Sequence, residues 1–149
     1  MPRWVLANSD DGPNIPTISA YTNFIVGSAK VVRNFLGSNV SNVEIGNQVN
    51  DMLQFEMKLA KITAPDEFRY NQTRMFNPMP LSKLQDATDS FINVSPRGQI
   101  DWSAYLNGIY NTSVGIVVNS SERVVVAEKF YVNDLLNLLD STPNRVIGN

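Results

Sequence analysis

The chain of 149 residues contains no histidine and no cysteine, and these two absences remove whole classes of chemistry. Without histidine, the commonest general base and the commonest zinc ligand are both missing. Without cysteine, there is no disulfide framework, no thiolate zinc site, no thiol nucleophile and no sign of the redox compartment. Catalysis by this chain alone would therefore depend on carboxylates, lysine, tyrosine or hydroxyl groups.

Long apolar runs and clustered positive charge are also missing. No apolar stretch approaches the roughly 18 residues that a membrane-spanning helix needs, and the first residues are not followed by the apolar core of a signal peptide. The twelve basic residues are scattered and the net charge is −2, whereas nucleic-acid binding requires clustered cations. The sequence predicts a soluble chain with no transmembrane segment and no nucleic-acid partner.

Hydrophobic periodicity predicts two long helices in the first half of the chain. Residues 17–36 place Tyr21, Ile25 and Phe35 close to the 3.6-residue period. A second helix follows after a short loop, so we expect the two to pack as an antiparallel hairpin.

Both ends of the second helix carry recognisable signals. Ser41 and Glu44 have the spacing of a capping box, in which each side chain accepts a hydrogen bond from the other residue's backbone N–H. At the far end, Pro65 biases Ala64 away from the helical conformation. The second helix is therefore expected to begin just after Ser41 and to end shortly before Pro65.

The second half of the chain is expected to hold shorter elements. Residues 66–80 contain Pro78 and Pro80 and are predicted to be a long irregular loop. Asp101 is a suitable helix N-cap. The β-branched runs at residues 114–118 and 124–126 flank a turn and predict two short strands or extended pieces. Helices are predicted at residues 81–87, 101–110 and 132–139. The expected fold class is mainly α: a bundle-like helical lobe with an antiparallel helix hairpin and one short β-hairpin or extended pair.

Two groups of polar residues are candidates for function. Asp86, Asp89 and Asp101 could supply the two carboxylates of an acid–base pair, but nothing in the sequence fixes their separation, and helix-surface and capping roles explain them better. Five asparagines complete Asn-x-Ser/Thr acceptor sequences, which favour a glycosylated extracellular surface over asparagine-rich loops. They are Asn39, Asn71, Asn93, Asn111 and Asn119. Asn93 is the weakest of them, because Pro96 follows its serine.

Five sequence blocks follow one another in a fixed order. They are FEMKLAKITAP (55–65), FNPMPLSKLQ (76–85), IDWSAYLNGI (100–109), ERVVVAEKFYVNDLLNLL (122–139) and STPNRVIGN (141–149). In this order they resemble the N-terminal part of the ectodomain of neprilysin-like M13 zinc metallopeptidases. AYTNFIVGSAKVVRNFLG (20–37) is similar to the family helix just upstream. Residues 1–14 fit poorly, so we divide the chain into a leading segment (1–16) and part of the M13 N-terminal helical domain (17–149).

The resemblance implies a two-lobed, largely helical peptidase. In the family, zinc is held by a His-Glu-x-x-His helix and a downstream glutamate, and the helix glutamate acts as general base. No position here matches these residues, so the resemblance assigns no catalytic, cofactor-binding or metal residue to this chain. It implies a non-catalytic lobe that caps the active-site chamber and restricts the access of peptides. The implied location is extracellular, secreted or in the ectodomain of a type II membrane protein.

Two kinds of partner remain open at this point. In the first interpretation, the chain is a cut piece whose partner is the remainder of the peptidase ectodomain, which carries the zinc. In the alternative, it is an abbreviated gene product: a standalone, secreted and catalytically inert interaction module that binds a peptide or protein partner. A reading frame that continues into a His-Glu-x-x-His motif would favour the first, and a stop codon after residue 149 would favour the second.

Overall fold

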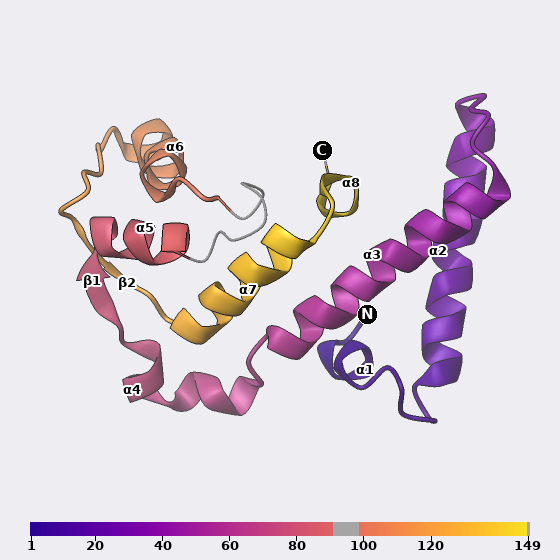
Figure 1. The fold of residues 1–149 in the computed structure, drawn as a ribbon, viewed down its shortest axis with the longest axis horizontal. Coiled ribbons are helices and arrows are strands. Elements are labelled where there is room, and N and C mark those ends of the chain that lie inside the picture. The colour runs from indigo at the N-terminus through magenta and orange to yellow at the C-terminus, as the bar shows by residue number, and fades with distance from the viewer. Residues whose placement is uncertain (91–98, 149) are drawn as a thin grey trace. The chain divides into compact units, whose positions relative to one another are not determined.

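The computed structural model describes residues 1–90 and 99–148, except for the side chain of Arg69. The described residues are 68% helical and include a small two-stranded antiparallel sheet, which confirms the predicted mainly α class (Figure 1). It divides into two compact units. Unit 1 comprises Met1–Thr63 and Pro143–Asn149, and unit 2 comprises Ala64–Thr142. The division into a leading segment (1–16) and one domain (17–149) stays a prediction.

Unit 1 is built around the predicted helix hairpin. Its elements are α1 (Arg3–Ala7), α2 (Ile15–Phe35), α3 (Asn42–Ile62) and α8 (Asn144–Ile147). α2 and α3 run antiparallel, and the two short helices α1 and α8 both pack against α3 (Figure 1). One buried core cluster consists of Ile45, Val49 and Leu53, which are spaced four residues apart along one side of α3. Tyr21 and Ile25 of α2 pack against this row.

The ends of α3 are set by the residues that the sequence indicates. The Ser41 Oγ accepts a hydrogen bond from the Glu44 N–H at 3.0 Å. The Glu44 carboxylate accepts a hydrogen bond from the Gln48 Nε2 at 2.7 Å, one turn further along. At the other end, the Thr63 Oγ1 donates to the Leu59 carbonyl at 2.7 Å, and the backbone leaves the helix in an extended conformation.

Unit 2 contains more regular structure than the sequence predicts. Its elements are the 3₁₀ helix η1 (Asp66–Tyr70), α4 (Gln72–Met75), β1 (Pro78–Pro80), α5 (Leu81–Ser90), α6 (Trp102–Val114), β2 (Arg123–Val125) and α7 (Lys129–Ser141). The predicted helices at 81–87, 101–110 and 132–139 are present and longer than expected. The prediction of an irregular loop at residues 66–80 is wrong, because η1, α4 and β1 occupy most of it.

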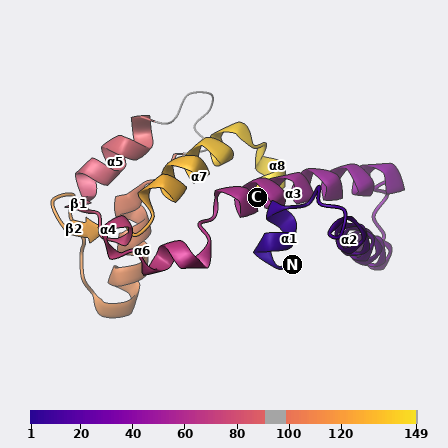
Figure 2. The same ribbon diagram turned by 90° about the horizontal axis from the view of Figure 1, so that it is seen from below.

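The structure contains a two-stranded sheet, but only the second of the two predicted strand segments takes part in it. β2 pairs antiparallel with β1, with Met79 opposite Val124, and the two strands lie side by side in Figure 1 and Figure 2. Residues 115–119, all of which are described, form no strand. α6 ends at Gly115, whose φ of 68° turns the chain out of the helix. Of the predicted alternatives, two strands or two extended pieces, the strand is formed only at residues 123–125, whereas residues 115–119 lie outside any helix or strand.

A polar clamp joins α5 to α6 beside the small core of unit 2. The Gln85 Oε1 accepts a hydrogen bond from the Trp102 N–H at 3.0 Å, and the Gln85 Nε2 donates to the Ile100 carbonyl at 2.9 Å. The Trp102 Nε1 donates to the Thr88 Oγ1 at 2.6 Å, and Thr88 is only 1% exposed. The clamp fixes the indole against the core of Leu81, Leu84 and Val126.

We expect Thr88→Val to destabilise unit 2 by about 1–3 kcal/mol, because the Trp102 indole Nε1–H then loses its acceptor beside the buried Thr88. The measurement is urea unfolding followed by Trp102 fluorescence in a Trp4→Phe background. The matched control is Thr112→Val on α6, whose exposed Oγ1 donates to the Gly108 carbonyl. Equal midpoints for the two variants would contradict the clamp.

Candidate interaction surfaces

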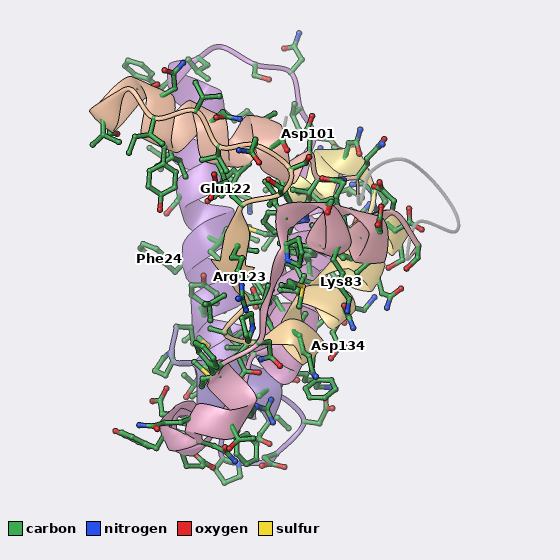
Figure 3. The ribbon with its side chains drawn as sticks, turned by 90° about the vertical axis from the view of Figure 1, so that its left-hand side faces the viewer. Phe24, Lys83, Asp101, Glu122, Arg123 and Asp134 are labelled. Carbon is green, nitrogen blue, oxygen red and sulfur yellow. The ribbon has the colours of Figure 1, made fainter. Side chains whose placement is uncertain are left out.

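α2 has apolar side chains on two sides, and only one side is covered. None of its residues, all of which are described, is buried. Phe24 is 71% exposed, Val31 68% and Phe35 89%. Their spacing of seven and four residues places them on one face of the helix, and Phe24 projects from α2 away from the ribbon (Figure 3). We name these three residues the α2 stripe.

Sequence reasoning found the inner side of α2 and missed the outer one. The predicted periodic residues Tyr21 and Ile25 pack against α3, as expected. Phe35, assigned to the same face, belongs to the exposed stripe. The spacing of Phe24 and Val31 was a usable signal, because apolar residues all round a helix indicate burial on more than one side.

A partly buried polar contact joins α2 and α3 within the hairpin. The Tyr21 hydroxyl donates to the Glu56 Oε1 at 3.4 Å, and the buried Glu56 Oε2 has no hydrogen-bond partner among the described residues. The pKa of Tyr21 is raised above its ordinary value of 10.0, first because burial disfavours the phenolate and then because of the adjacent Glu56 carboxylate. Neutral Tyr21 is thus favoured within the hairpin.

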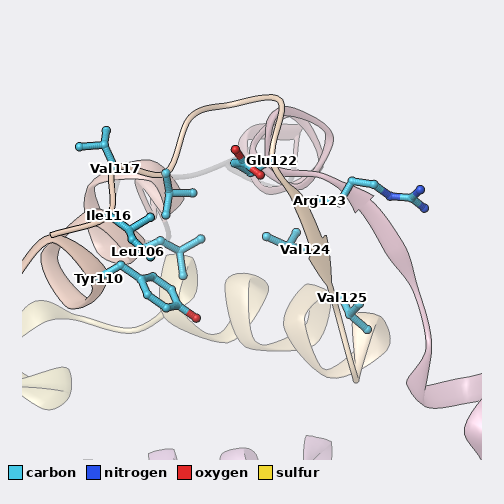
Figure 4. A pocket seen from close by; sticks show the side chains of 9 residues that line it. Leu106, Tyr110, Ile116, Val117, Glu122, Arg123, Val124 and Val125 are labelled. Carbon is cyan, nitrogen blue, oxygen red and sulfur yellow. The ribbon is translucent and has the colours of Figure 1, made fainter. Parts of the chain in front are cut away.

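Unit 2 has an apolar groove of about 540 Å³ along one side of β2. One wall is formed by β2 and the preceding Glu122. The other is formed by Leu106 and Tyr110 of α6 and by residues 116–118 (Figure 4). We name it the β2 groove. Ile116 is 55% exposed and Tyr110 45%, so part of the apolar lining of the groove faces solvent.

One asparagine holds the second wall of the β2 groove in place. The Asn107 Nδ2 donates to the Val118 carbonyl at 2.9 Å, and the Asn107 Oδ1 accepts from the Val118 N–H at 2.7 Å. This pair of bonds gives an irregular segment a fixed backbone position, much as a strand partner would. The segment after α6 is therefore ordered by a side chain rather than by a sheet.

A third feature of unit 2 is an arginine held between elements far apart in the sequence. The Arg74 Nε donates to both carboxylate oxygens of Glu128, at 2.9 and 3.1 Å. Its guanidinium lies 4.8 Å from the centre of the Phe68 ring and 5.8 Å from that of Phe130. The hydrogen bond to Glu128 raises the Arg74 pKa further above its ordinary range. Arg74 thus joins η1 and α4 to the start of α7.

The model of peptidase family M13 matches residues 2–149. The chain belongs to peptidase family M13. It corresponds to the N-terminal region of neprilysin-like members, which confirms the resemblance noted in the sequence.

The relatives of this M13 chain are much longer proteins. It is 24% identical to Neprilysin-1 of Trittame loki over 132 residues, which is 89% of this chain and 16% of the relative. It is 29% identical to neprilysin of Oryctolagus cuniculus over 121 residues, 81% of the chain and 16% of the relative. It is 26% identical to endothelin-converting enzyme 1 of Bos taurus over 136 residues, which is 91% of this chain and 16% of the relative. The chain thus spans about a sixth of the length of these relatives.

The zinc that the family implies does not fit the residues of this M13 chain. Histidine and cysteine are absent from the sequence, and in residues 1–90 and 99–148 no three acidic side chains gather closely enough to hold a metal ion. Asp101 caps α6, since its Oδ1 accepts from the Ala104 N–H at 2.8 Å. Asp89 accepts from the Gln85 Nε2 at 3.0 Å, and Asp86 is exposed on α5. These carboxylates have surface and capping roles.

Four of the five glycosylation candidates lie within the described residues, and all four are exposed. They are Asn39, Asn71, Asn111 and Asn119, whereas Asn93 lies outside the described residues. The Asn71 Oδ1 accepts from the Arg74 N–H and caps α4. The Asn119 Nδ2 donates to the Glu122 Oε1 at 3.1 Å. Asn39 lies in the loop between α2 and α3, where its backbone is outside any helix.

None of the described helices combines the length and the apolar character needed to cross a lipid bilayer.

Proposed function

We propose that this chain is a non-catalytic segment of the cap lobe of a neprilysin-like zinc metalloendopeptidase. In this role it helps to form the wall that restricts the access of peptides to the active-site chamber. Its residues 17–149 form part of the family's N-terminal helical domain, and its partner is the remainder of the peptidase ectodomain, which carries the zinc. The observation that carries the proposal is the α2 stripe, an uncovered apolar helix face in a chain without a catalytic ligand set.

Burial energetics support a protein partner for this face. Covering a phenylalanine or valine side chain contributes about 1.5–3 kcal/mol relative to leaving it in water. Exposed apolar patches of adjacent side chains on soluble proteins are typical of interaction sites. Phe24, Val31 and Phe35 together offer such a patch, and α2 has no acidic residue that would oppose its burial.

The same proposal places the chain outside the cell, secreted or as part of a membrane-anchored ectodomain, with N-linked sugar. Its support is the presence of five acceptor sequences and the exposure of the four that are described. Asn39 is the best placed of the four, because acceptor asparagines are typical of surface loops. Asn111 lies within α6, and Asn119 uses its Nδ2 in a hydrogen bond.

We expect a chimera to retain peptidase activity when this chain replaces the matching stretch of Oryctolagus cuniculus neprilysin. The chimera should cleave a short fluorogenic peptide and leave a folded protein containing the same sequence intact. The chain alone, with added zinc, should cleave neither. The double variant Phe24→Asp/Phe35→Asp should lower the yield of active chimera about tenfold or more. It places two charges in a helix face that is buried when the peptidase assembles. The control is Asn23→Asp, an exposed position beside the stripe.

Each outcome of this experiment decides a different part of the proposal. Equal yields from the stripe variant and the Asn23→Asp control would show that the stripe is not covered in the peptidase. Rapid cleavage of the folded protein by an otherwise active chimera would contradict the access-restricting role. An inactive, misassembled chimera beside a stable isolated chain would favour the standalone interaction module.

We further expect the intact mass of the chain secreted from a eukaryotic host to exceed the sequence mass by at least one N-glycan. Endoglycosidase should remove the difference. Asn39→Gln should remove one glycan, whereas Asn111→Gln should leave the mass of the sugar unchanged. A secreted chain with the unmodified mass would contradict the glycosylation proposal.

A further inference from the structure

Two backbone hydrogen bonds at the ends of the β1–β2 pair show which of its residue pairs exchange hydrogen bonds and which do not. The Val126 N–H donates to the Asn77 carbonyl at 3.1 Å, and the Leu81 N–H donates to the Glu122 carbonyl at 2.8 Å. These bonds lie just beyond the two ends of the strands. In an antiparallel ladder, hydrogen-bonded pairs alternate with pairs that exchange no hydrogen bonds.

This alternation makes the two outer edges of the sheet chemically different. Pro78 opposite Val125 and Pro80 opposite Arg123 are the pairs without mutual hydrogen bonds, so their backbone groups point away from the partner strand. On β1 both outward positions are prolines, which have no N–H, so this edge resists the addition of another strand. On β2 the outward positions are Arg123 and Val125, which keep both N–H and C=O. Within residues 1–90 and 99–148, the β2 edge is therefore the one open to a further strand.

The open edge of β2 is also a wall of the β2 groove. Opposite it stand Leu106 and Tyr110 of α6 together with residues 116–118, so the edge faces an apolar surface across the groove (Figure 4). A second copy of this chain fits poorly there. Its own β2 would arrive with β1 attached along the far edge, where the α6 wall already stands. A single extended segment has no such attachment.

We propose that an extended segment from another part of the M13 peptidase polypeptide, outside these 149 residues, adds to the open edge of β2 as a third strand. Its backbone pairs with Arg123 and Val125, and every second side chain is apolar and enters the β2 groove. An acidic side chain near Arg123 complements its exposed positive charge. The source follows from length, since the matched region is about a sixth of each relative, and the inference rests on the proposed function.

The test is a set of overlapping peptides of about 12 residues, longer than a typical strand. They are tiled across the part of Trittame loki Neprilysin-1 that lies outside the matched region. Binding to the fluorescently labelled full chain is measured by anisotropy. We expect one peptide or a pair of overlapping ones to bind, with alternating apolar residues. Val125→Pro should weaken this binding about tenfold, because it removes an outward N–H and no β1–β2 hydrogen bond.

Two further variants separate a loss of peptide binding from a loss of folding. Val125→Ala keeps the N–H and should retain most of the binding. Ile116→Glu changes a partly exposed side chain of the opposite wall that points toward the groove (Figure 4), and it should weaken binding without altering unfolding.

The inference is overturned if no tiled peptide binds, if Val125→Pro binds as well as the unchanged chain, or if scrambled peptides bind equally well. A concentration-dependent dimer that Val125→Pro abolishes would also overturn it, in favour of a second copy. If the neprilysin chimera assembles while no peptide binds, the proposed function stands and the third strand alone is wrong.

Discussion

The main physical constraint on this structure is that its elements do not bury all of its apolar side chains. Unit 1 encloses its α2–α3 interface mainly around three aliphatic residues of α3, and the outer side of α2 is left in water. In unit 2, α6 likewise has no buried residue along its described length. Helices with apolar residues on two sides are stable when both sides are buried. The uncovered faces therefore say more about the chain's role than any single polar residue does.

Hydrogen bonds from polar side chains hold segments in place where the apolar core is small. Gln85, Thr88 and Asn107 each bond to backbone or indole groups of another segment, and together they hold α6 and the wall after it. Arg74 does the same for η1, α4 and α7 through Glu128 and two aromatic rings. Such directional contacts specify one arrangement where a small core would allow several. Of these contacts, the pair of hydrogen bonds from Asn107 to Val118 holds a segment that lines the β2 groove.

The sequence predicts those elements whose causes are local. The start of α3 at Ser41, its end before Pro65 and the cap of α6 at Asp101 all follow from one or two residues with a known backbone effect. The family assignment also follows from ordered blocks of residues. β1 could not be predicted in this way, because Pro78 and Pro80 disfavour a strand unless their nitrogens face outward, and that depends on β2, some 45 residues later. The outer stripe of α2 was overlooked because its helix was interpreted as one-sided.

The central claim is that the α2 stripe is covered when the chain is part of a peptidase. The most direct measurement is hydrogen exchange of the α2 backbone amides in the isolated chain and in the chimera with Oryctolagus cuniculus neprilysin. The account predicts exchange about tenfold slower or more in the chimera around Phe24, Val31 and Phe35, since local opening then also requires undocking. Equal exchange rates for α2 in the two proteins would contradict it.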